Sequence, residues 1–158
     1  MAFPKVGNLA PAFNLLDQDG NKVSLKDFRD KNNVVLYFYP KAMTPGCTMQ
    51  ACGIRDSKAA LKKAKTVVLG VSPDPVARLG RFIDKQDLNF TLLSDEDHAV
   101  TDKYGCWGLK KFMGREFMGV LRTSFIIGKD GRLKHVMDKV RTKTHHDDVL
   151  ALIGELGL

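Results

Sequence analysis

The stretch VVLYFYPKAMTPGCTMQAC, residues 34–52, joins an apolar segment to a segment that begins with helix-start signals. Its first six residues are β-branched, aliphatic or aromatic throughout, which is typical of a strand buried on both faces. Thr44 followed by Pro45 predicts an N-cap and a first helical residue, because proline disfavours helical backbone in the residue before it and fits position N1. We expect the Thr44 hydroxyl to accept a hydrogen bond from a first-turn amide. Cys47 then falls in the first turn of the helix.

Strand and helix signals alternate on both sides of this stretch. Short apolar runs bounded by turn residues predict further strands near residues 12–15, 67–72, 91–93, 122–127 and 133–136. Apolar residues at helical spacing predict helices over residues 45–63, from about residue 74 and from about residue 147. Residues 17–20 and 130–131 read as hairpin turns. The alternation predicts an α/β protein with a central mixed β-sheet flanked by helices and an N-terminal hairpin, which is compatible with a thioredoxin-like fold.

Length and composition predict a single domain over residues 1–158. The chain contains no linker-like stretch and no internal repeat, and a core of this size needs neither a disulfide nor a metal for stability. Its apolar runs are far shorter than the ~20 residues of a membrane-spanning helix. The first residues lack the pattern of a secretory signal, so we expect a cytoplasmic protein with no membrane partner and with reduced cysteines.

The net charge of +7 arises from 25 Lys and Arg against 18 Asp and Glu. Residues 103–158 hold 11 of the basic and 6 of the acidic residues, so the excess is skewed toward this segment without forming a block. Because zinc-finger spacing and RNP-type aromatic motifs are missing, we expect no specific nucleic-acid partner. A solvated basic face that keeps the protein soluble is the favoured interpretation.

Cys47 is the candidate nucleophile of the chain. The free amides and the positive dipole end of a helix N-terminus stabilise a thiolate. The alternative is a cysteine that packs as a small hydrophobe.

Cys52 lies five residues after Cys47, on a different side of the same predicted helix. In an intact helix this spacing separates the Cα atoms by roughly 8–9 Å, whereas a disulfide needs less than about 7 Å. A bond between the two would require the first turns to unwind. Gly53 would lower that cost, since glycine inside a helix is about 1 kcal/mol worse than alanine. The alternative for Cys52 is a buried residue of a static helix.

The remaining cysteine and the histidines predict no metal or cofactor site. The Cys47–Cys52 spacing is at the outer limit for zinc, and the second ligand pair is missing. Cys106 stands alone, so we interpret it as a core or half-exposed free thiol. The histidines at positions 98, 135, 145 and 146 are interpreted as capping or surface groups.

The run Pro40-x3-Thr44-x2-Cys47 resembles the active-site signature of the peroxiredoxin family. Residues 37–41 together with residues 47–56 are similar to the bacterioferritin comigratory protein (PrxQ) subgroup. Further collinear similarities extend the resemblance over almost the whole chain, at residues 7–13, 15–20, 68–72, 90–95 and 122–127.

The resemblance implies a thioredoxin-fold, thiol-dependent peroxidase that reduces hydrogen peroxide and organic hydroperoxides in antioxidant defence. It assigns the peroxidatic thiolate to Cys47 and a hydroxyl that binds thiolate and peroxide to Thr44. Pro40 would shield the pocket, and Arg122 would stabilise the thiolate and orient the peroxide. A permanently charged, planar guanidinium suits both roles of Arg122.

The resemblance further implies that Cys52 resolves the Cys47 sulfenic acid in an intramolecular disulfide, formed by local unfolding and recycled by thioredoxin. A monomer is expected, because an internal resolving cysteine needs no partner chain. Cys106 matches no role, and a glutaredoxin- or thiol-coupled path through it stays open. Two other functions stay open: a thioredoxin-like protein disulfide reductase, and a non-catalytic binding module that uses the basic C-terminal half.

Overall fold

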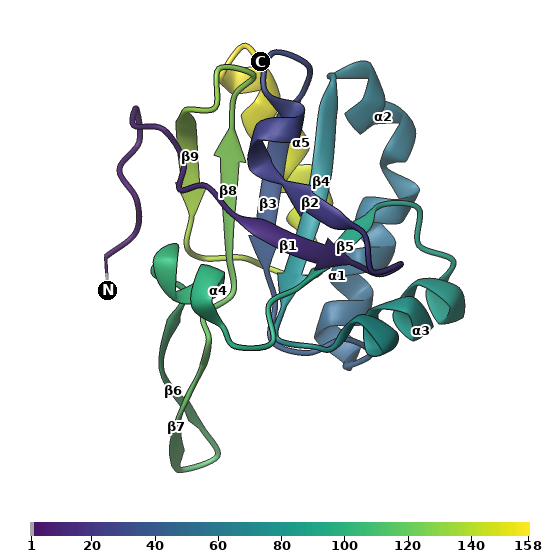
Figure 1. The fold of residues 1–158 in the computed structure, drawn as a ribbon, viewed down its shortest axis with the longest axis vertical. Coiled ribbons are helices and arrows are strands. Elements are labelled where there is room, and N and C mark those ends of the chain that lie inside the picture. The colour runs from purple at the N-terminus through teal and green to yellow at the C-terminus, as the bar shows by residue number, and fades with distance from the viewer. Residues whose placement is uncertain (1) are drawn as a thin grey trace.

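A mixed seven-stranded sheet forms the centre of the computed structural model, which describes residues 2–158. The strand order is β2-β1-β5-β4-β3-β8-β9 (Figure 1). Its strands are β1 (Asn14–Asp17), β2 (Lys22–Ser24), β3 (Asn33–Phe38), β4 (Thr66–Ser72), β5 (Thr91–Ser94), β8 (Thr123–Ile127) and β9 (Leu133–Met137). The three central strands β3, β4 and β5 are parallel, and the outer strands pair antiparallel. The expected α/β class, mixed sheet and N-terminal hairpin are confirmed.

Two short helices, over residues 25–28 and 99–103, were not predicted from the sequence, and the others differ from the prediction mainly in where they begin and end. The helices are η1 (Leu25–Phe28), α1 (Pro45–Asp56), α2 (Lys58–Lys63), α3 (Val76–Gln86), α4 (Ala99–Lys103) and α5 (His145–Glu155). The single helix predicted over 45–63 is interrupted at Ser57, whose hydroxyl donates to the Gly53 carbonyl at 2.9 Å. Such a bond back to the preceding turn competes with the regular helix. No helix in residues 2–158 is long and apolar enough to cross a bilayer.

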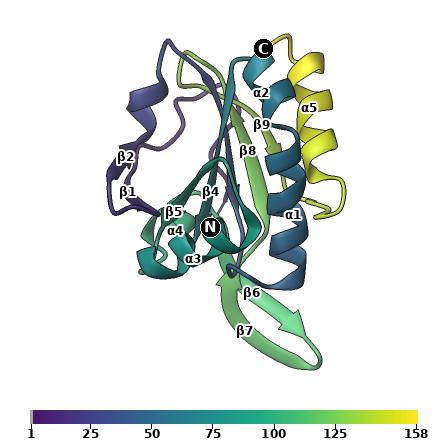
Figure 2. The same cartoon turned by 90° about the vertical axis from the view of Figure 1, so that its right-hand side faces the viewer.

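The two faces of the sheet bury separate apolar clusters, and successive residues of β3 alternate between them. Val35 and Tyr37 pack with apolar side chains of α1, α2, α3 and α5. Val34 and Leu36 pack with residues of the N-terminal segment, η1 and α4. Figure 2 shows α1 and α5 side by side on one face of the sheet. Every β3 residue is buried, as the unbroken apolar run predicts.

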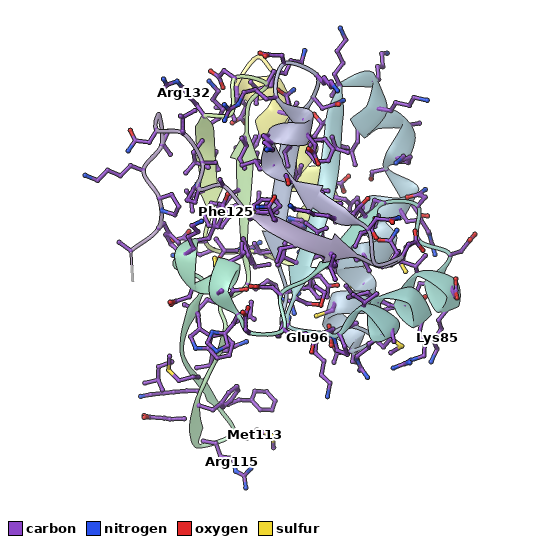
Figure 3. All side chains as sticks on the ribbon, viewed as in Figure 1. Lys85, Glu96, Met113, Arg115, Phe125 and Arg132 are labelled. Carbon is purple, nitrogen blue, oxygen red and sulfur yellow. The ribbon has the colours of Figure 1, made fainter. Side chains whose placement is uncertain are left out.

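A second, two-stranded sheet projects from the body of the protein (Figures 1 and 2). It consists of β6 (Trp107–Phe112) and β7 (Arg115–Val120), joined at a turn where Met113 and Gly114 both have positive φ. Figure 3 shows Met113 and Arg115 at its free end, where the Met113 side chain is 87% exposed. This hairpin was not predicted from the sequence. Its exposed apolar residues occupy both faces, so the sequence lacks the in-out alternation that marks a half-buried strand.

Candidate active site

Cys47 occupies the first turn of α1, as the sequence predicts. Thr44 is the N-cap and Pro45 the first helical residue, and the Cys47 side chain is only 2% exposed. Amides of a first helical turn have no acceptor within the helix, and they lie at the positive end of its dipole. This position stabilises negative charge on the sulfur.

The expected cap hydrogen bond of Thr44 is wrong, although its position as N-cap is correct. The Thr44 hydroxyl donates to the Lys41 carbonyl at 2.8 Å, and no first-turn amide donates to it. Met43 between them has a φ of 68°, which turns the chain so that the Lys41 carbonyl faces the hydroxyl. The first-turn amides are thereby left without a side-chain partner. Pro40 lies half-buried in the same β3–α1 loop.

Arg122 meets Cys47 through the pairing of β3 with β8. Phe38, the last residue of β3, lies opposite Thr123, so Arg122 is placed where the β3–α1 loop begins. The strand expected over 122–127 begins one residue later, at Thr123. Nη2 of Arg122 donates to the Cys47 sulfur at 3.3 Å. The structure therefore brings a fixed positive charge onto the candidate nucleophile.

Gln50 completes this arrangement, and its role was not predicted from the sequence. Its Oε1 accepts a 2.6 Å hydrogen bond from Nη1 of Arg122, and its side chain is fully buried. Gln50 follows Cys47 by three residues, so the two side chains share a face of α1. That helical spacing is the signal that would have singled out a polar residue beside the nucleophile.

Cys52 lies apart from Cys47, on the side of α1 that faces the end of α3. Its sulfur is 3.6 Å from Oε1 of Gln86, and Arg55 donates to the Gln86 carbonyl at 2.6 Å. All three cysteines of the chain are free thiols. The intact helix thus keeps the two predicted partners separate, as their spacing requires.

Gly53 has a packing role that the sequence did not reveal. A Cβ added there would collide with the imidazole of His146 on α5. Glycine at position 53 therefore allows α5 to approach α1. This packing role is separate from any effect of Gly53 on the unwinding of α1.

Cys106 lies outside the site, in the apolar cluster on the opposite face of the sheet. It is fully buried, and its thiol is 3.6 Å from the Tyr104 carbonyl. Burial raises the pKa of this thiol to about 12. Of the two placements expected, the core placement is confirmed, and a buried neutral thiol is chemically inert.

The interpretation of His145 as a surface or capping group is wrong. Its ring is fully buried, with Nε2 at 2.6 Å from the Ser124 hydroxyl, and it packs against Tyr37. Burial lowers the pKa of His145 to about 4. The negative charge of Asp148 opposes this shift, and the positive charge of Arg122 adds to it. His98 occupies the N-cap position of α4, but its side chain does not cap the helix. The half-buried ring stacks instead on Trp107, with ring centroids 3.8 Å apart.

Lys110, on β6 of the projecting hairpin, has a lowered pKa. Partial burial lowers the pKa of Lys110, and so does the positive charge of Arg122, while Cys47 acts in the opposite direction. Within the part of the chain that the structure describes, residues 2–158, no three His, Cys, Asp or Glu side chains gather as metal ligands.

Comparison with known proteins identifies the family. The AhpC/TSA family model matches residues 6–136. The chain belongs to the AhpC/TSA family. It is 54% identical over 151 residues to peroxiredoxin Bcp of Escherichia coli strain K12, with 96% of each chain covered. It is 41% identical over 152 residues to peroxiredoxin Bcp of Bacillus subtilis strain 168, again with 96% of each covered.

Solved structures place the chain in the PrxQ/Bcp group of AhpC/TSA proteins. Peroxidoxin BcpB of Mycobacterium tuberculosis has a TM-score of 0.84 at 33% identity, covering 96% of this chain and 97% of that one. PrxQ of Xylella fastidiosa has a TM-score of 0.92 at 25% identity, with both chains covered completely. The resemblance to this subgroup and the thioredoxin-like fold are thereby confirmed.

Proposed function

We propose that the chain is a thiol-dependent peroxidase that reduces hydrogen peroxide and organic hydroperoxides, with Cys47 as its nucleophile. The observation that carries the proposal is the 3.3 Å contact between Arg122 and the Cys47 sulfur in the first turn of α1. The names of its relatives support it: the E. coli protein is a peroxiredoxin, and a Xanthomonas campestris neighbour, with a TM-score of 0.85 at 30% identity over 90% of each chain, is described by its alkyl peroxide reduction activity.

In the first step, the Cys47 thiolate attacks one oxygen of the peroxide O–O bond. A sulfur–oxygen bond forms, the O–O bond breaks, and the electron pair of that bond leaves on the second oxygen, which takes up a proton as water or an alcohol. Cys47 is oxidised to a sulfenic acid and the peroxide is reduced. Arg122 supplies donors for the charge that moves onto the leaving oxygen, and Gln50 fixes its guanidinium. Thr44 and Pro40, in the loop before α1, are proposed to bind the peroxide and to cover the pocket.

In the second step, the Cys52 thiol attacks the Cys47 sulfenic acid, and a disulfide forms with release of water. The intact helix forbids this bond on distance grounds, so α1 must unwind locally. A dithiol of thioredoxin then reduces the disulfide and is itself oxidised. Because Cys106 is fully buried, a glutaredoxin-coupled path through it is disfavoured.

We further propose one domain over residues 1–158, a monomeric assembly and a cytoplasmic location.

The test is peroxide consumption with thioredoxin and thioredoxin reductase as electron source. Cys47→Ser must abolish turnover, whereas Cys106→Ala, which alters the opposite face of the sheet, must retain it. A protein disulfide reductase would instead reduce insulin disulfides and consume little peroxide. A non-catalytic basic binding module would show salt-dependent retention on DNA together with an unreactive Cys47.

Mass spectrometry of the peroxide-treated protein tests the second step separately. A Cys47–Cys52 linkage is expected. Any linkage that contains Cys106 would contradict the assignment of Cys52 as resolving residue.

A further inference from the structure

Asp74, in the segment before α3, and Arg78, on α3, form an ion pair. This pair binds both backbone polar groups of Ala42, a residue of the loop that precedes α1. The Ala42 amide donates to Oδ2 of Asp74 at 2.7 Å, and Nη2 of Arg78 donates to the Ala42 carbonyl at 2.8 Å. Asp74 and Arg78 are themselves paired, with Oδ1 and Nε 3.2 Å apart. Both backbone polar groups of Ala42 are thus bound from the same side by two opposite charges. Ala42 is fully buried, and Asp74 is 5% exposed.

Asp74 is in turn fixed to the sheet. Ser72, the last residue of β4, donates its hydroxyl to Oδ2 of Asp74 at 2.7 Å. Ser94, the last residue of β5, donates its hydroxyl to the Asp74 carbonyl at 2.6 Å. A buried carboxylate held by several donors has one orientation. The Asp74–Arg78 pair is therefore a rigid anchor for Ala42.

The anchored residue immediately precedes the strained part of the loop. Met43 has a φ of 68°, a left-handed conformation that is unfavourable for a residue with a side chain. Surrounding contacts must impose such a conformation, and the bonds to Ala42 are the contacts that adjoin it. Thr44 and the first turn of α1 follow directly. The direction in which α1 leaves the loop, and hence the position of Cys47 relative to Arg122, depends on this anchor.

We propose that Asp74 and Arg78 are positioning residues that hold Ala42 so that α1 presents Cys47 to Arg122, and that they favour the folded over the unwound first turn. This inference rests on the proposed peroxidase function. Contacts that stabilise one of two conformations shift the population toward it. Loosening the anchor should therefore slow the attack of Cys47 on peroxide, which needs the folded turn, and speed formation of the Cys47–Cys52 bond, which needs the unwound one.

The opposite signs of these two effects are what a shift from the folded to the unwound turn predicts, whereas misfolding of the chain would slow both steps. Arg78→Met removes the donor to the Ala42 carbonyl, while Asp74 keeps its hydrogen bonds from Ser72 and from the Ala42 amide. Arg78→Lys keeps the charge but not the planar fork that reaches Asp74 and Ala42 together, and it should restore the wild-type rates only partly. Arg81→Met, an exposed arginine on the same helix, is the matched control.

Stopped-flow measurement of sulfenic acid formation in a Cys52→Ser background isolates the first step. We expect Arg78→Met to slow it about tenfold or more, since small displacements of reacting groups have effects of this size. With Cys52 present, the same substitution should accelerate disulfide formation and reduce over-oxidation at high peroxide. Rates equal to those of Arg81→Met in both steps, or slowing of both steps, would overturn the proposal.

Alkylation of Cys47 needs no peroxide, so it tests the positioning role of Asp74 and Arg78 separately from the peroxidase proposal. Alkylation of Cys47 by a bulky maleimide, in the Cys52→Ser background, should be faster in Arg78→Met than in Arg81→Met because the buried sulfur is released from its position. If peroxide does not oxidise Cys47 even in the wild-type chain, the peroxidase proposal fails, and this alkylation difference still decides whether the anchor positions Cys47. Equal alkylation rates would show that it does not.

Discussion

Gln50 binds Arg122 through a 2.6 Å hydrogen bond between Oε1 and Nη1, and this bond leaves the other terminal nitrogen of the guanidinium on the Cys47 sulfur. Gln50 and Cys47 lie on one face of α1, so a single helix supplies both the nucleophile and the group that orients its cation.

Gln50→Ala should slow oxidation of Cys47 by peroxide. A hydrogen bond to a charged group contributes about 1.5–3 kcal/mol, so a loss of roughly tenfold or more is expected if the bond keeps Arg122 in place. The measurement is the stopped-flow rate of the first step. Met49→Ala, at an exposed neighbouring position of the same helix, is the control. If Gln50→Ala and Met49→Ala react equally fast, Gln50 does not orient Arg122.

Cys106 should resist alkylation in the folded protein. Because burial raises its pKa to about 12, very little of this thiol is ionised near pH 8. Treatment with iodoacetamide followed by mass spectrometry should label Cys106 only after denaturant is added, whereas the half-exposed Cys52 is labelled in the native state. If Cys106 is labelled as fast as Cys52 in the native protein, Cys106 is not a buried, unreactive thiol.

His145 should make the protein less stable as the pH falls below neutrality. Its pKa is lowered to about 4, first by burial, so the unfolded chain binds a proton near pH 6.5 while the folded chain does not. The associated stability is present in full above about pH 6.5 and is lost as the pH falls toward about 4. Linkage predicts a loss of about 2 kcal/mol in the free energy of unfolding between about pH 7 and about pH 5.

Urea unfolding at the two pH values measures this loss. Because other groups also titrate, the comparison is with His145→Gln, which cannot bind the proton and should lose less stability. Equal losses in the wild type and in His145→Gln would contradict a buried neutral His145.

Gly53 needs two substitutions for a clean test, because an added Cβ collides with His146. In a His146→Ala background the collision with the imidazole is removed, and Gly53→Ala should then act mainly through helix stability. About 1 kcal/mol of added stability predicts disulfide formation that is roughly fivefold slower. Stopped-flow resolution rates are compared between the His146→Ala protein and the double variant. The same rate in both would show that Gly53 does not assist unwinding.

Local sequence was enough to place Cys47, because a buried strand, an N-cap, a proline and a glycine each act on adjacent residues. The role of Arg122 was expected only from the family resemblance, since it depends on the antiparallel pairing of β8 with β3. The role of Gln50 depends on the same pairing, and without Arg122 opposite it a buried glutamine has no visible purpose.

Other features depend on contacts that neighbouring residues do not encode. His145 lies in a polar run, HHDD, yet α5 packs it against the sheet. The Thr44 hydroxyl was expected to accept a hydrogen bond from a first-turn amide. The left-handed backbone of Met43 instead directs it to the Lys41 carbonyl. Asp74 and Arg78 show a salt-bridge spacing, whereas their joint capture of Ala42 appears only when α3 and the loop meet.

The β6–β7 hairpin is closed where it leaves the body: Trp107 pairs with Val120, and the Leu121 amide donates to the Cys106 carbonyl at 2.6 Å. Arg122 follows this closure directly, so its position is set by the closed base and by β8 rather than by the length of the arm. The hairpin is consequently an insertion site built into the chain. A peptide or a whole domain grafted between Met113 and Gly114 would extend the arm without changing the register that brings Arg122 to Cys47.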